Sequence, residues 1–213
     1  MKKYLQTYKN DICNKAFLIA IAGGFILLCT SLVINYYAGS FATQSASNSV
    51  TDIILDNIAV RDVDGVFVYG SLLFWLFASV LLVIRPRRIP FILKSVALFI
   101  FIRSVSISLT HIAPFPGQLY IPPNSFTRYF TFGGDLFFSG HTGLPFLLAL
   151  LFWPNRKLRF TFMLIAVIFA VVVLLGHYHY SIDVFAAFFI TPTIAHLARL
   201  FFDKDYQTFL SVI

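Results

Sequence analysis

The segment AFLIAIAGGFILLCTSLVINY, residues 16–36, is a long apolar run without a charged side chain. An α-helix rises about 1.5 Å per residue, so about 20 apolar residues cross the hydrocarbon core of a bilayer. This run therefore predicts a membrane-spanning helix. A cleaved signal peptide is the alternative, because basic residues precede the run, but the run is longer than the roughly 7 to 15 residues of a signal core.

Five further apolar runs follow, at residues 66–84, 91–110, 136–153, 160–176 and 182–202. The fourth and fifth of the six runs are short and polar at one end. The chain is 59% hydrophobic and 12% charged, which is about half the charged share of a soluble domain. The strand alternation of a barrel is absent. The sequence thus predicts an all-α integral membrane protein, a six-transmembrane helix bundle that forms one domain over residues 1–213, with a leader at 1–15, six spans within 16–202 and a tail at 203–213.

Basic residues mark every second loop of this predicted bundle. They precede the first span, separate the second span from the third and the fourth from the fifth, and return near the end of the sixth (Lys2, Lys3, Lys9, Lys15; Arg85, Arg87, Arg88, Lys94; Arg156, Lys157, Arg159; Arg199, Lys204). The positive-inside rule places both termini in the cytoplasm and the other loops in the periplasm, lumen or exterior. We expect a bacterial inner membrane. Since topology explains the net charge of +7, no nucleic-acid partner is expected.

Two longer loops lie on the outer side. Residues 38–64 contain a short apolar piece at 52–60, which is either a solvated connector, the interpretation that we favour, or a segment along the membrane surface. Residues 113–134 are rich in proline and predict a rigid, non-helical cover (Pro114, Pro116, Pro122, Pro123). The outer loops therefore close one end of the bundle.

Two polar segments interrupt the apolar pattern. The first, GGDLFFSGHTG at 133–143, opens the fourth span, and the second, HYHYSIDV at 177–184, opens the sixth. His179 and Asp183 are four residues apart, so we expect them to share one face of a helix. Counting the crossings places both segments in the outer half of the bilayer, together with Arg103.

Two histidines and a carboxylate at one membrane face suit phosphoryl transfer through a covalent intermediate. His179 is the candidate nucleophile, because Asp183 can hold the other ring nitrogen and stabilise the imidazolium. His141 is the candidate acid and base for the leaving and entering oxygens. His177 is six residues from Asp183 and is the weaker candidate for the nucleophile.

The phosphate needs donors, and four residues are candidates for binding it or its headgroup. Arg103 lies inside a span and offers a bidentate fork, although a structural arginine that pairs with carbonyl groups or an acid is the alternative. Ser139 and Gly140 offer backbone N–H groups if the helix is interrupted there. Asp135 would orient a histidine or a cationic headgroup.

Other interpretations of the polar residues remain open. His111 and His196 are expected to form ordinary interhelical hydrogen bonds, with a functional role for His111 also open. A metal site is conceivable from His and Asp ligands, but a third clear outer ligand is missing and we expect no metal and no cofactor. A transporter with a proton relay is a third class of function. It is disfavoured because the polar residues cluster at one face and do not trace a path through the bundle.

The polar segments resemble those of the sphingomyelin synthase family, within the superfamily of type 2 phosphatidic acid phosphatases. FIRSVSISLTHIAPFPG from Phe101, GGDLFFSGHT from Gly133 and HYSIDV from His179 are similar to three of the four signature regions. The resemblance implies six spans, an outward-facing His141/His179/Asp183 triad with His179 as nucleophile, and transfer of a phospho-headgroup.

The chain also departs from the family pattern. The first signature block, Pro-Leu-Pro-Asp, is represented by Asp52 without the prolines, and Gly133 stands where cysteine is usual. Ordinary lipid phosphatases carry Ser-Arg shortly before the nucleophilic histidine, where this chain has Val172 and Val173. The valines favour the synthase-like branch.

The expected activity is therefore that of a lipid phosphotransferase. It would move a phosphocholine or phosphoethanolamine type of headgroup from a phospholipid donor to a lipid alcohol acceptor such as ceramide or diacylglycerol, through a phosphohistidine. The alternative is a lipid phosphate phosphatase or phospholipase C-like hydrolase that uses the same His/His/Asp site and releases the group to water.

Overall fold

The computed structural model describes residues 14–118 and 134–213, and these residues are helical or irregular, with no strand among them. The basic leader at 1–13, Cys13, and the part of the second outer loop that includes Arg128 and Gly133 lie outside the described residues. The helices in chain order are α2 (Lys15–Gln44), η1 (Leu55–Asn57), α3 (Asp64–Ile84), η2 (Pro86–Arg88), α4 (Ile89–Leu109), α5 (Gly140–Leu151), α6 (Arg156–Leu175), α7 (Ser181–Phe201) and α8 (Asp203–Leu210).

Five helices are long and apolar enough to cross a membrane: α2, α4 with η2, α3, α6 and α7. They support the prediction of an integral membrane protein. The run predicted as the fourth span, 136–153, differs, because its helix α5 has only 12 residues and a length of about 18 Å. Six complete spans and the cytoplasmic placement of the termini stay predictions.

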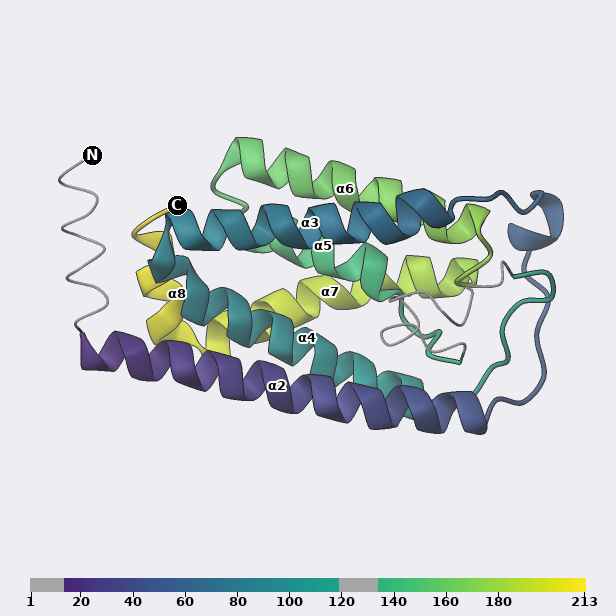
Figure 1. Ribbon diagram of the computed structural model, residues 1–213, viewed down its shortest axis with the longest axis horizontal. Helices are drawn as coiled ribbons and strands as arrows, with labels where there is room; N and C mark the ends of the chain where they lie inside the picture. Colours follow the sequence, from purple (N-terminus) through teal and green to yellow (C-terminus); the bar gives the residue numbers. More distant parts are fainter. Residues whose placement is uncertain (1–13, 119–133) are drawn as a thin grey trace.

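The chain runs back and forth along one axis. Figure 1 shows that α2 begins at the same end of the bundle as the one at which α8 lies, and that the long loops lie at the other end. We call this second end, where α3 and α7 begin, the loop end. Helix α2 packs along α4, and α5 packs against α6 and α7. Figure 1 also shows that α5 stops short of the loop end that α3 and α7 reach.

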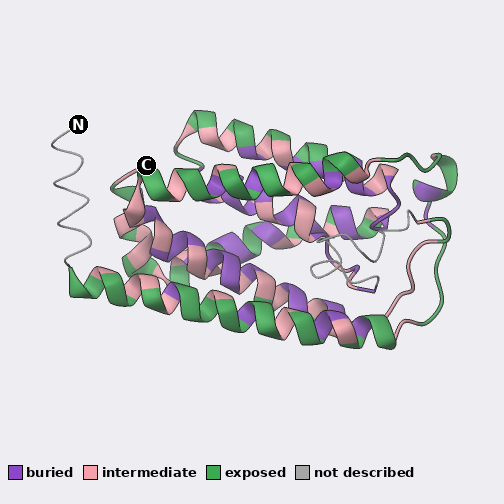
Figure 2. Ribbon diagram, in the orientation of Figure 1, coloured by how far each residue is buried: buried purple, intermediate pink, exposed green. Residues whose placement is uncertain are grey.

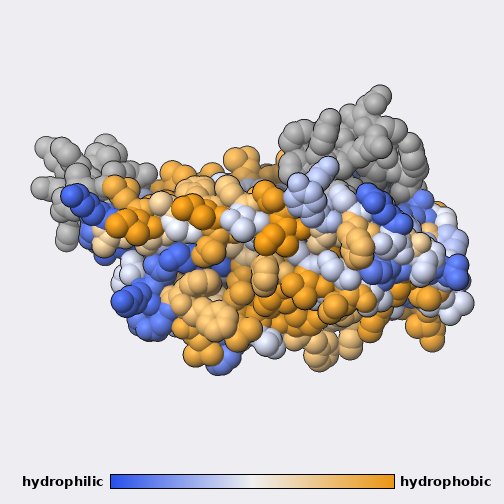
Figure 3. All heavy atoms as spheres, turned by 90° about the horizontal axis from the view of Figure 1, so that it is seen from below, coloured by the Kyte–Doolittle hydropathy of each residue, from blue (hydrophilic) through white to orange (hydrophobic). Residues whose placement is uncertain are grey.

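Large aromatic side chains fill the centre of the bundle. Phe91, Phe99, Phe138, Phe152 and Phe162 are each at least 98% buried. Buried residues line the inner faces of the helices, and exposed ones line the outer faces of α2 and α3 (Figure 2). The exposed residues of these two helices are mostly apolar, and an apolar band separates more polar ends on the face in Figure 3. Such a surface fits lipid better than water.

Candidate active site

His179 and Asp183 meet at the start of α7. The distance between His179 Nδ1 and Asp183 Oδ2 is 3.4 Å, and both side chains are buried. The contact does not arise from a shared helix face as the spacing predicted, because α7 begins at Ser181 and His179 precedes it. Instead, Asp183 Oδ2 also accepts the N–H of Tyr180 at 3.0 Å. The carboxylate caps the helix and reaches back to the imidazole, which leaves His179 Nε2 for the nucleophile.

Arg103 supports the irregular segment that precedes α5. Its Nε donates to the carbonyl of Phe138 at 2.7 Å, and its Nη2 donates to the carbonyl of Asp135 at 2.5 Å and to Asp135 Oδ2 at 3.1 Å. Carbonyl groups at membrane depth need protein partners, so the arginine has the structural role that was one of its two interpretations. Its Nη1 has no hydrogen-bond partner within the described residues, which leaves one edge of the guanidinium for a ligand.

The segment before α5 is also tied to other helices. The N–H of Gly134 donates to Thr43 Oγ1 at 3.1 Å, and a Cβ at Gly134 would lie 2.7 Å from the Cα of Thr43. Only glycine allows this close approach to the end of α2. The N–H of Ser139 donates to the carbonyl of Asp183 at 3.1 Å. This last contact joins the two polar segments through the backbone.

Ser139 is the N-cap of α5, which begins at Gly140 and thus later than the predicted span that begins at residue 136. Its side chain accepts the N–H of Thr142 at 3.4 Å and its carbonyl accepts the N–H of Gly143 at 3.0 Å, which makes it the N-cap. The N–H of Ser139 itself is occupied by Asp183. The N–H groups of Gly140 and His141 have no acceptor within the described residues, so they are the free donors at this helix start.

Aromatic rings hold the imidazole of His141. The ring centroid of Phe67 lies 4.3 Å from that of His141, and the ring of Phe169 lies 5.9 Å away. On its other side Phe67 stacks against Tyr178 at 4.5 Å. His141 is within electrostatic range of both His179 and Arg103, so the structure brings the candidate acid/base close to the candidate nucleophile.

Tyr178 anchors this stack to α3. Its hydroxyl donates to Asp64 Oδ1 at the first turn of that helix. Burial raises the pKa of Tyr178, and the Asp64 carboxylate raises it further. The tyrosine is therefore a neutral donor at any physiological pH. No local sequence pattern predicts roles for Phe67, Asp64 or Tyr178, because the hydrogen bond between Asp64 and Tyr178 joins α3 to a turn more than 100 residues away.

Asp52 is a second residue whose contacts were missed. Its Oδ2 accepts the N–H of Ser181 at 2.6 Å, and its Oδ1 accepts the N–H groups of Ile54 at 2.9 Å and Leu55 at 3.1 Å. Burial raises the pKa of the Asp52 carboxyl, but the backbone donors, Ser181 first, lower it more, and the pKa lies below its ordinary value of 3.8. The aspartate thus clamps the first outer loop onto the start of α7.

The solvated connector that we favoured for residues 52–60 is therefore wrong for its first part. Asp52 and Leu55 are 94% and 98% buried. The reason is the contact with α7, reinforced by Tyr180, whose hydroxyl donates to the carbonyl of Ala113 at 2.9 Å and accepts the N–H of Val50 at 3.3 Å. The described parts of both outer loops are thereby tied to the start of α7. Residues 110–118 are non-helical, as predicted for the described part of the second loop.

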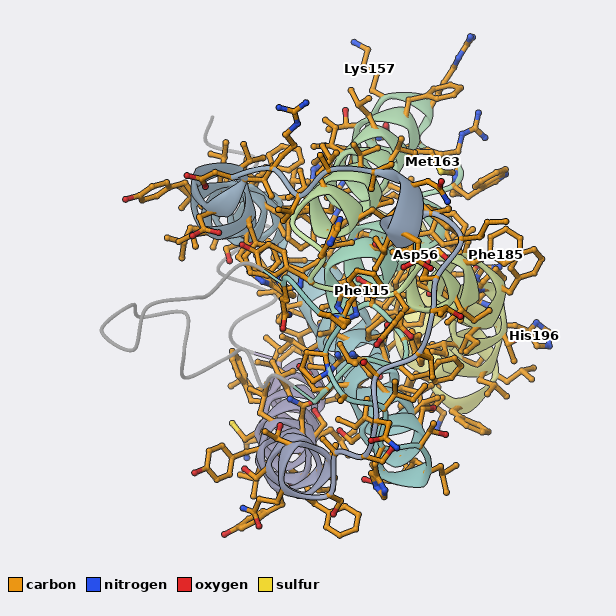
Figure 4. All side chains as sticks on the ribbon, turned by 90° about the vertical axis from the view of Figure 1, so that its right-hand side faces the viewer. Asp56, Phe115, Lys157, Met163, Phe185 and His196 are labelled. Atoms are coloured by element: carbon orange, nitrogen blue, oxygen red, sulfur yellow. The ribbon has the colours of Figure 1, made fainter. Side chains whose placement is uncertain are left out.

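The remaining histidines differ in their surroundings. His196 lies exposed on α7 and points away from the bundle in Figure 4, so the interhelical hydrogen bond predicted for it is wrong. His111 packs its ring against Phe41 at 4.9 Å, and its buried Nε2 has no partner among the described residues. His177 is buried beside Phe115.

Residues 133–200 match the sequence model described as PAP2 superfamily C-terminal. The match covers less than half of the chain, and within it lie α5, α6 and most of α7 with His141, His179 and Asp183. It supports the PAP2 superfamily, whose members are typically phosphatases or phosphotransferases. The sphingomyelin synthase branch is a finer assignment that stays a prediction. No curated protein and no solved structure matches the chain significantly.

Proposed function

We propose that the protein is a lipid phosphotransferase that moves a phosphocholine or phosphoethanolamine type of headgroup from a phospholipid to a lipid alcohol such as ceramide or diacylglycerol. The observation that carries the proposal is the 3.4 Å contact between His179 Nδ1 and Asp183 Oδ2. His141 lies in electrostatic range of His179 and of Arg103. The loop end is proposed to face the periplasm, lumen or exterior.

The reaction has two balanced steps. In the first, Nε2 of neutral His179 attacks phosphorus, a P–N bond forms, and the P–O bond to the diacylglycerol breaks while protonated His141 gives its proton to the leaving oxygen. Asp183 stabilises the imidazolium that forms. In the second, His141 takes the proton of the acceptor hydroxyl, a new P–O bond forms, and the P–N bond breaks to restore His179.

The start of α5 is the proposed phosphate site. It offers the free N–H groups of Gly140 and His141, and an anion is stabilised there by the helix dipole. The free Nη1 of Arg103 would add a charged donor. Ser139 contributes as the N-cap. Asp135 partly neutralises the positive charge of Arg103 and lies in electrostatic range of His179. Its proposed role is to orient these two side chains.

The start of α7 is less suited to phosphate, since carboxylates already occupy it. Asp52 accepts the N–H of Ser181 and Asp183 accepts the N–H of Tyr180. Two negative charges at this helix start repel an anion and favour a cationic imidazole. The nucleophile and the phosphate are thus proposed to sit on different helix starts, which the hydrogen bond from Ser139 to Asp183 holds together.

A hydrolase that uses the same phosphohistidine is the second candidate, since the PAP2 match fits both activities. The phosphate-binding Ser-Arg pair of ordinary lipid phosphatases has no counterpart here. Val172 and Val173 are buried in an apolar cluster with Phe67 and Tyr178. This packing supports the transferase over the phosphatase.

The proposal is tested with purified protein in liposomes that contain a phospholipid labelled in its headgroup. With ceramide or diacylglycerol added, mass spectrometry should find the labelled headgroup on the acceptor. Free phosphate or free headgroup phosphate as the only product would refute transfer and favour the hydrolase.

The shared intermediate is tested by variants. Peptides prepared at alkaline pH, at which the P–N bond of phosphohistidine survives, should carry the headgroup phosphate on His179, and the His179→Ala protein should lose turnover. His196→Ala is the matched control, since this histidine lies exposed on α7, and it should keep full activity. Turnover retained by His179→Ala would overturn the phosphohistidine mechanism.

A further inference from the structure

His177 occupies a backbone position that favours glycine. Helix α6 ends in a turn in which the N–H of His177 donates to the carbonyl of Leu174 at 3.0 Å and the N–H of Tyr178 donates to the carbonyl of Val173 at 2.9 Å. This pair of bonds is a Schellman motif, and His177 is its left-handed residue, with φ of 54°. It is the only residue other than glycine with positive φ among those that the structure describes.

The imidazole of His177 is buried without hydrogen bonds. The residue is 5% exposed, and neither Nδ1 nor Nε2 has a partner within the described residues. The ring packs edge to face against Phe115, with centroids 5.2 Å apart. Burying two polar atoms without partners is unfavourable, so both the backbone and the side chain of His177 depart from the most stable choice for this turn.

Glycine at position 177 would remove both unfavourable features, and no contact of the described chain uses the imidazole as a donor or acceptor. Residues that break a local rule in this way are concentrated at functional sites. His177 is also near the proposed nucleophile in the chain. Only Tyr178 lies between His177 and His179, so their Cα atoms are at most about 7 Å apart. His177 therefore belongs to the same turn as the proposed nucleophile.

The surroundings of His177 indicate which group it would bind. Phe115 also contacts Tyr180, at 5.8 Å between centroids, and packs with the buried cluster of Leu55, Leu136 and Tyr180. A neutral imidazole in such apolar surroundings has one N–H donor and one nitrogen acceptor. A hydroxyl or amide, which has both functions, complements it better than a phosphate does. Figure 4 shows Phe115 near the centre of the loop end, where a lipid headgroup region would enter.

We propose that His177 is a substrate-binding residue that hydrogen-bonds the polar group of the acceptor lipid. This inference rests on the proposed transferase function and adds the acceptor subsite to it. The group recognised is a hydroxyl or amide beside the reacting alcohol, which ceramide supplies with its amide and second hydroxyl. The ester of diacylglycerol can only accept a hydrogen bond from the imidazole.

The test uses His177→Gly, which suits the left-handed turn and should melt at or above the wild-type temperature. Formation of phosphohistidine from the labelled donor without acceptor should be unchanged. The KM for the acceptor should rise about tenfold, as expected for the loss of one or two hydrogen bonds. His177→Asn tolerates the same backbone and offers a donor and an acceptor, so it should restore part of the loss.

The acceptors compared are ceramide, diacylglycerol and a simple long-chain alcohol without a neighbouring polar group. The variant should lose its preference for the polar acceptors over the simple alcohol, and the lipid with the larger loss identifies the amide or the ester as the bound group. Unchanged acceptor KM and preference in a folded His177→Gly protein would overturn the proposal. An equal loss of phosphohistidine formation would also overturn it, by placing His177 in the donor step. Absence of phosphohistidine in the wild type would instead count against the proposed function.

Discussion

The clamp between Asp52 and the start of α7 predicts that a residue of the outer loop controls the nucleophile. Asp52→Asn keeps one oxygen, which can continue to accept the local N–H groups of Ile54 and Leu55. Its amide NH₂ would then face the N–H of Ser181, so a donor replaces the acceptor at a contact of 2.6 Å. The substitution thus removes the bond to α7 and preserves the local turn.

The size of the effect follows from the bond that is lost. A hydrogen bond to a charged acceptor contributes about 1.5 to 3 kcal/mol, so Asp52→Asn should destabilise the start of α7 by about this amount. His179 lies just before this start, and a displacement of about 1 Å can cost about 10²-fold in rate. We expect kcat to fall by about 10-fold to 100-fold, with a smaller change in donor KM.

The pH dependence gives a second readout of the clamp. Because the pKa of Asp52 is below 3.8 in the folded protein, its contribution to stability is complete above the unfolded value and is lost as the pH falls through the folded value. The difference in melting temperature between wild type and Asp52→Asn should therefore be constant from pH 8 to about pH 4. Below about pH 4 the difference should shrink, because the Asp52 carboxylate becomes protonated.

The matched control is Asp56→Asn, which removes the same charge from an exposed position in the same loop (Figure 4). Asp56 accepts the N–H of Asp52 at 2.9 Å and has no contact with α7 among its hydrogen bonds. It should keep most of the activity, and its stability should change by about 0.5 kcal/mol or less. Wild-type kcat in Asp52→Asn, or equal losses in the two variants, would refute the clamp.

Three further substitutions probe the site and the packing beneath it. Arg103→Lys replaces a fork that satisfies two carbonyl groups and a carboxylate with a single point of charge, and should lower kcat/KM by at least about tenfold in the labelled-lipid assay. Phe67→Leu removes the ring that stacks on the proposed acid/base histidine at 4.3 Å; it should shift the pH profile of kcat, whereas a loss of stability alone would leave the profile in place. Gly143→Ala would bring a Cβ to 2.5 Å from Phe99 Cζ and should cost about 1 to 3 kcal/mol by thermal melting in detergent, whereas Gly65→Ala, with nothing within 4 Å, should cost less than about 0.5 kcal/mol.

The long apolar runs predicted the helices well where a span is continuous. Residues 66–84 and 182–202 lie within two residues of α3 and α7. The run at 136–153 predicted a helix that starts too early, because Leu136, Phe137 and Phe138 are as apolar as residues inside a membrane-spanning helix. The carbonyl of Phe138 instead accepts a hydrogen bond from Arg103, and the helix starts only where Ser139 caps it. Hydropathy records burial and cannot distinguish a buried helix from a buried irregular segment.

The proposed triad was predictable and the residues around it were not. His179 and Asp183 are four residues apart, so both a continuous helix and a helix start capped by Asp183 bring their side chains together. Asp52 and Phe67 reach the site through contacts that span more than 70 residues, and one sequence carries no local signal for such contacts. The backbone of His177 was hidden for a different reason, since a left-handed residue is predicted from glycine or asparagine and this turn contains neither at that position.

The starts of α5 and α7, where the two polar segments lie, differ in their charges and in whether their N–H groups have acceptors. At α7, Asp52 and Asp183 accept the N–H groups of Ser181 and Tyr180 and add negative charge beside His179, which would stabilise the imidazolium of the proposed mechanism. At α5, the N–H groups of Gly140 and His141 have no acceptor in the described part of the chain and Arg103 adds positive charge, which would favour the proposed phosphate. A backbone hydrogen bond of 3.1 Å, from the N–H of Ser139 to the carbonyl of Asp183, holds the positively charged start of α5 beside the negatively charged start of α7. The late start of α5, at Gly140 and not at residue 136, therefore has a consequence for the proposed chemistry. A continuous helix from residue 136 would satisfy the same N–H groups internally and leave the proposed phosphate site without its neutral donors.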